Sequence, residues 1–412
     1  MSKLEQLINA LCPHGVPFIK LSDICAIKGR IGFRGYKRED LVSTNGAITL
    51  SPTNIETNRI NWDNCTFLSW EKYYESPEIM VQNNDIIFTT RASIGKIGIV
   101  KDMPQETTIN PQVVILRTEA KCNADYLNYI LHTSSVTKEI AKITGSGTIP
   151  LITQKDLGKI VVPVPPLEVQ AEIVKILDSF TELTAELTAE LTARKKQYVH
   201  YRDSLLSFGT DVPRIKIGEI TNVFSAARVH KDEWTKSGVP FWRSSDLISF
   251  FNGVDNNHGK AYISHELYEK LSAKSGKIKK GDVLVTGGGT IGIPYIVPND
   301  EPMYVKDADL LDIQRNDKLN SSFLYHYFLS TEFRKYLANI THNATIAHYT
   351  ITQIKDTPVP VPPIEEQERI VSILDRFDKL CNDISEGLPA EIEARRKQYE
   401  YYRDKLLSFE EA

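Results

Sequence analysis

The residues of this sequence best suited to bind another molecule are basic side chains on a glycine-containing segment. Lys28–Arg38 reads KGRIGFRGYKR and holds five basic residues, interleaved aromatics and no acidic residue. Arg228, His230 and Lys231 occupy a similar place in the second half of the chain. Arginine can hydrogen-bond a base edge at two points, and lysine holds phosphate, so both segments favour contact with nucleic acid. A solvated surface loop is the alternative for each cluster taken alone.

A glycine-rich stretch, GGGTIG at Gly287–Gly292, formally satisfies the G-x-G-x-x-G pattern of dinucleotide-binding proteins and follows the strand-like DVLVT. Pro294 stands where the following helix should form, and the aligned TRASIG of the first half keeps only the final glycine. We therefore predict a turn or a close backbone approach here. No Gly-Lys pair is followed by Ser or Thr, so the P-loop route to ATP is excluded.

The sequence gives little support for a catalytic metal site. Asp102, Glu119 and Lys121 loosely resemble a Mg²⁺-binding nuclease constellation, but the proline that usually precedes the aspartate is missing and the other half lacks the pattern. His342 and His348 have zinc-like spacing without a cysteine pair. There is no G-x-S-x-G and no aromatic-ended Asn/Asp-Pro-Pro tetrapeptide of an adenine methyltransferase. We predict a chain without an active site and without a metal.

The chain repeats itself. VPVPPLEVQAEIVKILDSF at 162–180 returns as VPVPPIEEQERIVSILDRF at 359–377, and ARKKQYVHYRDSLLSF at 193–208 returns as ARRKQYEYYRDKLLSF at 394–409. Fainter matches continue upstream. A period of about 200 residues predicts two related domains rather than a solenoid, whose repeats span about 20 to 50 residues.

The matched segments predict two long helices. From Leu167, apolar and aromatic residues recur with a period of 3.5 for about 42 residues, which indicates a coiled coil. TAELTAEL from Thr184 could grow or shrink by whole helical turns. Gly387 and Pro389 predict an interruption of the second helix near 387–389. We expect the two helices to pair antiparallel and to be related by a pseudo-twofold axis. The residues predicted to form this coiled coil are Ile173, Leu177, Phe180, Leu187, Leu191, Tyr198, Tyr201, Leu205, Ile370, Leu374, Phe377, Ile384, Tyr399, Tyr402 and Leu406.

Charge separates the helices from the rest of the chain. The net charge is −4 over 412 residues, of which 41% are hydrophobic and 25% charged. The acid excess lies in the two helices. Lys270–Lys280 adds five lysines with no acid, but its counterpart Tyr73–Asn83 has two glutamates and no lysine, so the repeat does not support this cluster. Five dispersed cysteines, no export signal and no apolar run of membrane-spanning length predict a cytoplasmic protein with reduced thiols.

Two VPVPPLEVQ-type segments, each leading into a long helix that ends in RKKQYxxYRDxLLSF, resemble the DNA-specificity subunit of type I restriction–modification systems. The resemblance implies a non-catalytic, sequence-specific DNA-binding subunit that reads a bipartite asymmetric site, one half-site per domain. The coiled coil would set the spacing and dock two methyltransferase (modification) subunits. A separate restriction/translocase subunit would join them, and S-adenosylmethionine, ATP and Mg²⁺ would belong to those partners.

The resemblance divides the chain into a first target-recognition domain at 1–160, a spacer helix at 161–210, a second target-recognition domain at 211–357 and a spacer helix at 358–412. We expect an α+β fold, with strands at DIIFT, VVILR and DVLVT and helices at 125–144 and 322–340. From local chemistry we predict these DNA contacts: Arg30, Arg34, Tyr36, Lys37, Arg91, Lys96, Arg228, His230, Lys231, Arg243 and Thr290.

Two other classes of function stay open at this point. One is a stand-alone nuclease or DNA methyltransferase, which would turn over DNA without partners. The other is a structural scaffold whose domains bind proteins and which has no salt-dependent affinity for DNA.

Overall fold

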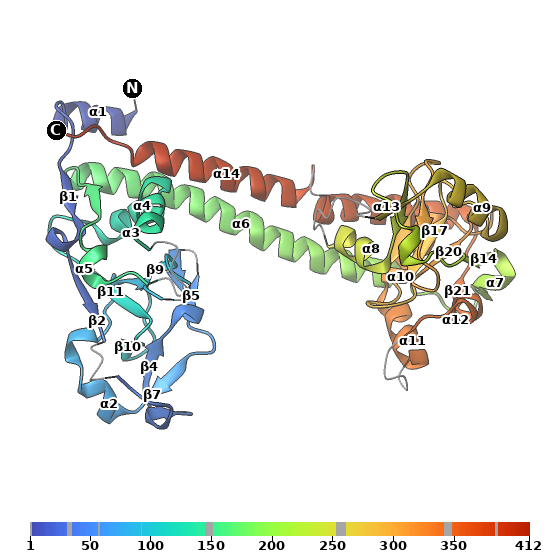
Figure 1. The fold of residues 1–412 in the computed structure, drawn as a ribbon, viewed down its shortest axis with the longest axis horizontal. Coiled ribbons are helices and arrows are strands. Elements are labelled where there is room, and N and C mark those ends of the chain that lie inside the picture. The colour runs from blue at the N-terminus through green and yellow to red at the C-terminus, as the bar shows by residue number, and fades with distance from the viewer. Residues whose placement is uncertain are drawn as a thin grey trace. The chain divides into compact units, whose positions relative to one another are not determined.

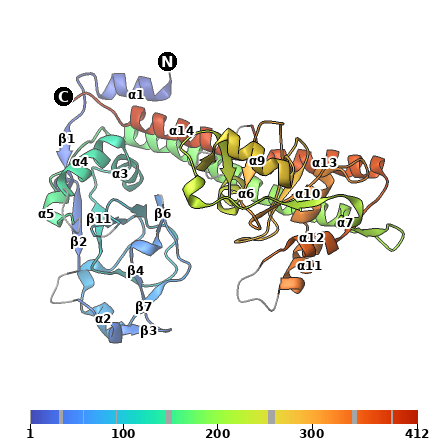
Figure 2. The ribbon, with the colours of Figure 1, turned by 45° about the vertical axis from the view of Figure 1, so that its right-hand side comes forward.

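The protein divides into two compact units that exchange helical segments. The computed structural model describes residues 2–30, 35–56, 58–91, 93–144, 151–252, 261–341, 348–383 and 386–412. Unit 1 comprises Met1–Glu186 with Glu393–Ala412, and unit 2 comprises Leu187–Ile392. Each unit therefore combines the globular domain of one repeat with the end of the other repeat's helix. Figures 1 and 2 show the elements of each unit.

Unit 1 is built on a six-stranded and a four-stranded sheet. Their strand orders are β2-β11-β8-β9-β6-β5 and β10-β4-β7-β3, and β1 pairs with β12 alone. The strands are β1 (Phe18–Lys20), β2 (Cys25–Gly29), β3 (Leu41–Val42), β4 (Ala47–Leu50), β5 (Ile55–Glu56), β6 (Asn58–Ile60), β7 (Thr66–Leu68), β8 (Ile86–Thr89), β9 (Ile97–Ile99), β10 (Thr107–Ile109), β11 (Val113–Thr118) and β12 (Val161–Pro163). The helices are α1 (Lys3–Leu11), α2 (Trp70–Tyr74), α3 (Ala124–Leu131), α4 (Ser134–Thr144), α5 (Gln154–Leu157) and the first part of α6 (Leu167–Leu205).

Unit 2 repeats this plan with smaller sheets. Their orders are β14-β20-β17-β18 and β16-β15-β19, and β13 pairs with β21. The strands are β13 (Arg214–Lys216), β14 (Val223–Ser225), β15 (Val239–Trp242), β16 (Ala261–Ile263), β17 (Val283–Thr286), β18 (Pro294–Ile296), β19 (Tyr304–Val305), β20 (Leu310–Ile313) and β21 (Pro358–Pro360). The helices are α7 (Ile217–Ile220), α8 (Ser244–Phe251), α9 (His265–Ser275), α10 (Ser321–Leu329), α11 (Thr331–Thr341), α12 (Ile351–Asp356), α13 (Ile364–Asn382) and part of α14 (Leu388–Leu406).

Alternation along the central strands places neighbouring residues in different hydrophobic cores. In unit 1, Val114 of β11 packs toward α3 and α4, whereas Ile115 packs toward the four-stranded sheet. In unit 2, Leu311 of β20 packs toward α10 and α11, whereas Leu310 packs toward Trp242 on the second sheet. The predicted α+β class and the strands at DIIFT, VVILR and DVLVT are confirmed.

The helices expected at 125–144 and 322–340 are each broken in two, which corrects the sequence prediction. Near the first break the hydroxyl of Thr133 donates to Ile130 O, and it accepts from the amide of Val136. At the second break the hydroxyl of Ser330 accepts from the amide of Phe333 at 3.2 Å. These hydroxyls compete with the helical backbone for hydrogen bonds and start a new helix.

Carboxylates from the exchanged segments hold the starts of these new helices. Asp203, on α6, accepts hydrogen bonds from the amide of Thr331 at 3.0 Å and from its hydroxyl. Asp404, on α14, accepts the same two bonds from Ser134 in unit 1. Burial opposes ionisation of Asp404, but the hydrogen bonds from Ser134 and Arg403 lower the pKa of its carboxyl below the ordinary value.

In each unit an aromatic stack also joins the helix of one repeat to the helix of the other. In unit 1, Phe180 stacks on Tyr402 with ring centroids 5.6 Å apart, and in unit 2, Tyr201 stacks on Phe377 at 5.3 Å. In each unit a residue of α6 therefore packs against the long helix of the other repeat. α13 ends at Asn382 and α14 begins at Leu388. Among the described residues no helix is both long and apolar enough to cross a membrane.

A buried glutamine docks each long helix on its own domain. In unit 1, Gln170 accepts from the amide of Asn123 at 2.8 Å and donates to Lys121 O and Pro165 O. In unit 2, Gln367 makes the equivalent three bonds to Asn320, Lys318 and Pro362. Both side chains are fully buried.

Replacing Gln170 with Leu should lower the free energy of unfolding by roughly 2–4 kcal/mol, because the partner groups lose their hydrogen bonds where water cannot replace them. Gln367→Leu should have a similar effect. Denaturant titration of the full chain measures both changes. The exposed Lys175→Leu on the same helix serves as the control. If Gln170→Leu unfolds like the control, Gln170 does not dock the helix.

Candidate nucleic-acid interface

The DNA contacts predicted in unit 1 fall into two groups. Arg30 and Tyr36 are held by other groups of the protein, whereas Lys37, Arg91 and Lys96 are exposed. Arg30, at the end of β2, is 8% exposed. Its guanidinium donates to Ile109 O and to the hydroxyl of Thr108, each at 3.1 Å, and lies 5.2 Å from the ring centre of Tyr36. Burial lowers the pKa of Arg30. Arg30 is therefore bound to β10, and the hydroxyl of Tyr36 lies 3.4 Å from that of Thr49 on β4, while Arg34 lies outside the described residues.

Lys37, Arg91 and Lys96 are exposed. Lys37 forms a solvent-exposed ion pair with Glu39 at 3.6 Å, which contributes little energy. Lys96 donates to Pro52 O at 3.4 Å, and Arg91 forms an isolated backbone bridge with Leu151. These cations lie at the edge of the fold, where a nucleic acid could reach them.

The turn that carries Arg91 and Lys96 recurs in unit 2 as the glycine-rich stretch with Thr290. Gly95 and Gly292 have φ of 83° and 74°, and their amides donate to Thr89 O and Thr286 O. A β-carbon on Gly292 would lie 2.6 Å from Leu337. β18 follows instead of a helix and pairs antiparallel with β17. The prediction of a turn in place of a dinucleotide site is confirmed.

In unit 2 the predicted contacts lie between β14 and β15, directly after β15, and between β17 and β18. Arg228, His230 and Lys231 are exposed on the segment between β14 and β15. Arg243 differs, because it donates two hydrogen bonds of 2.8 Å to Asp246, which raises its pKa, and stands 5.8 Å over the ring of Trp234. Thr290 is exposed, and its carbonyl accepts from the hydroxyl of Thr286.

The stripe residues of the long helices differ in burial. Ile173, Leu177, Ile370 and Leu374 are fully buried and belong to the cores of their units, and Tyr198 is 5% exposed. Phe180, Leu187, Leu191, Leu205, Phe377, Tyr399 and Leu406 are partly buried. Tyr201 and Tyr402 are exposed at the edges of their aromatic stacks. Ile384 lies outside the described residues.

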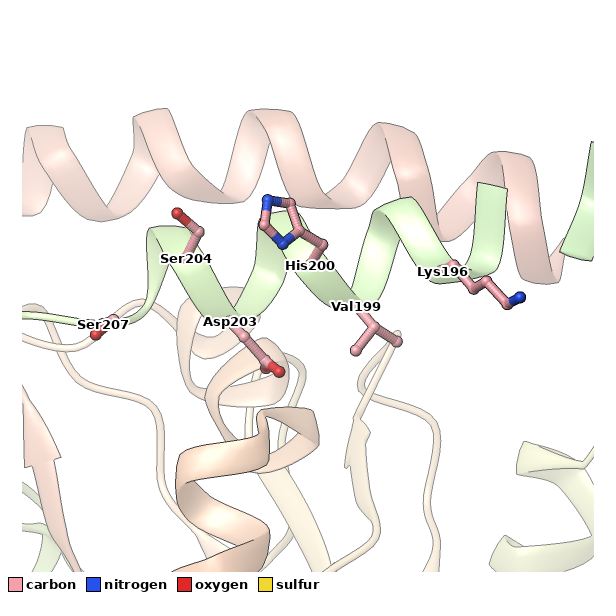
Figure 3. Close-up of a pocket in the computed structure, with 6 residues that line it drawn as sticks. All are labelled: Lys196, Val199, His200, Asp203, Ser204 and Ser207. Carbon is pink, nitrogen blue, oxygen red and sulfur yellow. The ribbon is translucent and has the colours of Figure 1, made fainter. Parts of the chain in front are cut away.

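Two matching surface hollows on the helix ends were not singled out by the sequence reasoning. The hollow of unit 2 is open, about 700 Å³, and lined by Lys196, Val199, His200, Asp203, Ser204 and Ser207 (Figure 3). The hollow of unit 1 is lined by Ser134, Lys397, Glu400, Tyr401, Arg403, Asp404, Lys405 and Ser408. Repetition of exposed residues, as in Lys196 with Lys397 and Ser207 with Ser408, was the signal in the sequence that could have found them.

Unit 2 also has a buried carboxyl group at a position where unit 1 has an apolar side chain. Asp312, on β20, is 7% exposed, and its Oδ1 has no hydrogen-bond partner among the described residues. Its counterpart in unit 1 is the buried Ile115. Burial, with a smaller contribution from Asp282, raises the pKa of Asp312 to about 8. The fold therefore favours the neutral form of Asp312, and ionising it costs stability.

The family model and the similar proteins all indicate the same family. The sequence model of the family described as type I restriction modification DNA specificity domain matches residues 13–194 and 210–394. A protein of Haemophilus influenzae named as a type I restriction enzyme specificity subunit is 38% identical over 268 residues, 63% of this chain and 66% of that protein. A type I restriction enzyme specificity subunit of Escherichia coli is 34% identical over 61% of this chain and 63% of its own length. The matched regions thus span just under two thirds of these relatives.

The fold agrees. A solved structure from work on complex assembly and conformational transition of the type I restriction–modification system aligns with 96% of this chain and 98% of its own, with a TM-score of 0.64 at 17% identity. Within the described residues, no group of three or more His, Cys, Asp and Glu side chains is arranged to hold a metal ion.

The buried carboxyl predicts a pH dependence. The pKa of Asp312 in the folded protein exceeds its ordinary value near 3.8, so the free energy of unfolding should fall as pH rises from about 4 to about 8 and level off above. The slope contributed by this group is at most about 1.4 kcal/mol per pH unit. Asp312→Ile should remove it, whereas the exposed Asp317→Asn should not. Thermal unfolding across this pH range measures the slope, and an unchanged slope in Asp312→Ile would exclude Asp312 as its source.

Proposed function

We propose, on the premise that this chain belongs to the type I restriction–modification DNA specificity family, that it reads a bipartite asymmetric DNA site, with one half-site per unit. The observation that carries the proposal is the twofold plan itself: two family-matched segments form two units of the same design. Duplicated readers with divergent surfaces suit a site whose two halves differ in sequence.

The exposed turns favour DNA as the ligand. Arg91 and Lys96 in unit 1 lie on a turn without carboxylates, and in unit 2 Arg228, His230 and Lys231 are exposed beside Asp232 and Glu233. Phosphate contacts position a protein on the duplex, and side chains that reach base edges specify the sequence. Arg30 and Arg243 would read a base only after leaving the protein partners that now hold them.

The spacing between half-sites is assigned to the helices. α6 is one helix of 39 residues, and both units contribute residues to it. Most side chains of its TAELTAEL stretch are exposed, so whole turns could be inserted there without breaking a core. A four-residue insertion adds about 6 Å along the axis and keeps most of the rotational phase of the helix.

Two modification subunits are proposed to dock on the two hollows. Lys196 and Lys397, and Ser207 and Ser408, are identical between the repeats although their side chains are exposed. Packing does not demand identity at exposed positions, so a partner that binds twice would explain it. In this proposal S-adenosylmethionine, ATP and Mg²⁺ serve the modification and restriction subunits, and the complex works in the cytoplasm, where chromosomal DNA lies.

Mapping of methylated adenines tests half-site reading and spacing together. The complete complex is expressed with this chain, with residues 15–160 exchanged for those of a relative, or with one additional TAEL. The exchange should alter one half-site and keep the other. The insertion should widen the gap and keep both half-sites. A change of both half-sites after the exchange contradicts one reader per unit, and altered half-sites after the insertion contradict the spacer.

Charge reversal tests the docking. Lys196→Glu and Lys397→Glu should each reduce the number of modification subunits per chain from two to one, and the double variant should bind none, as measured by the mass of the purified complex in light scattering. Lys195→Glu and Arg396→Glu provide the matched control, because these two residues are equivalent in the repeats and do not line the hollows. Full loading of the double variant would contradict docking at the hollows.

A further inference from the structure

Unit 2 carries a lysine patch that the predicted contacts leave unexplained. The patch consists of Lys270 and Lys274 on α9, and Lys277, Lys279 and Lys280 on the turn that leads to β17, and all five side chains are exposed. Lys277 pairs with Glu269 at 2.8 Å. Across the described part of the chain, no carboxylate forms an ion pair with the other four. α9 lies on the outside of the unit (Figures 1 and 2).

The same turn is present in unit 1 without lysines, because Gln82 and Asn83 stand in the places of Lys279 and Lys280. Asp282 accepts from the amide of Lys279 at 2.7 Å, and Asp85 accepts from the amide of Gln82 at 2.7 Å. Both aspartates are buried and precede the equivalent strands β17 and β8. Backbone geometry therefore does not require lysine here. In Tyr73–Asn83 of unit 1 the charged residues are two glutamates.

The lysine patch adjoins the predicted DNA contacts of unit 2. The hydroxyl of Tyr304 lies 3.4 Å from the hydroxyl of Ser275, at the end of α9, and donates to Ala227 O at 3.0 Å. Arg228 follows Ala227 directly. Tyr268 of α9 and Val229 share one apolar core. A single small core thus underlies both α9, which carries Lys270 and Lys274, and the segment that carries Arg228 and His230.

The chemistry of the lysine patch fits phosphate better than base edges. A lysine amine is a point charge on a flexible stem, which holds phosphate without fixing a base geometry. Four acidic residues lie close by: Glu266 and Glu269 are on α9 itself, Asp300 accepts from the amide of Lys280 at 2.9 Å, and Glu301 follows Asp300. They leave the amines of Lys270 and Lys274 unpaired.

We infer that the lysine patch binds the phosphate backbone of the duplex beside the half-site of unit 2, and that the matching place in unit 1 makes no such contact. The two units then differ in how they bind DNA. Unit 2 supplies the larger salt-dependent share of affinity, and unit 1 depends more on its own half-site sequence. The inference rests on the proposed function, because it needs DNA as the ligand.

The test uses the complex of this chain with its modification subunits. Lys270, Lys274 and Lys280 are replaced together by Gln, and binding to a cognate and a non-cognate duplex is followed by fluorescence anisotropy from 50 to 300 mM salt. Loss of three phosphate contacts should reduce the slope of log K against log salt by roughly 2.7 and weaken binding near 0.15 M salt roughly hundredfold, equally for both duplexes.

The control removes three lysines of the same unit from other elements: Lys318, Lys335 and Lys355 are exposed and are also replaced by Gln. Its slope should stay near that of the wild type. Equal slopes for the patch variant and the wild type would overturn the inference while leaving DNA reading intact. A wild-type complex without salt-dependent DNA affinity would instead contradict the proposed function, so the two failures are distinguishable.

Discussion

The structure depends on one constraint: each repeat completes the domain of the other. Asp203 and Asp404 place carboxylates at the first amides of α11 and α4, where a negative charge is stabilised by the unpaired N–H groups and the helix dipole. The stacks of Tyr201 on Phe377 and of Phe180 on Tyr402 lie within the same two exchanges. Because both exchanges use the same residue types at equivalent positions, neither unit is built from one repeat alone.

Much of this was visible in the sequence. The two near-identical helical segments predicted a duplicated α+β protein, and alternation predicted the central strands. The heptad stripe could identify the apolar side of a helix but not its partner. Ile173 and Leu177 pack into the core of their own unit, whereas Phe180, one turn further on, packs against Tyr402. The breaks before α4 and α11 were missed because they depend on Thr133, Ser330 and carboxylates far away in the chain.

The interface was harder to predict than the fold, because residue type does not reveal whether a charge is already paired. Arg30 and Arg243 have the chemistry of base-reading residues, yet both hold partners within the protein. The lysines of α9 were set aside because the other half lacks them. A difference between the repeats is not by itself evidence against a binding surface. When two units bind different sequences, a charged surface found in only one of them is informative about how they differ.

The discontinuity of unit 1 has a consequence for the order in which the protein is made. Unit 2 is a continuous stretch, 187–392, whereas unit 1 requires 393–412 in addition to 1–186. Ribosomes extend the chain from its amino end, and domains fold as units when their residues are available. Unit 1 is therefore begun first and finished second. A premature stop codon shortly after residue 392 would spare every residue of unit 2 but deprive unit 1 of Tyr402 and Asp404.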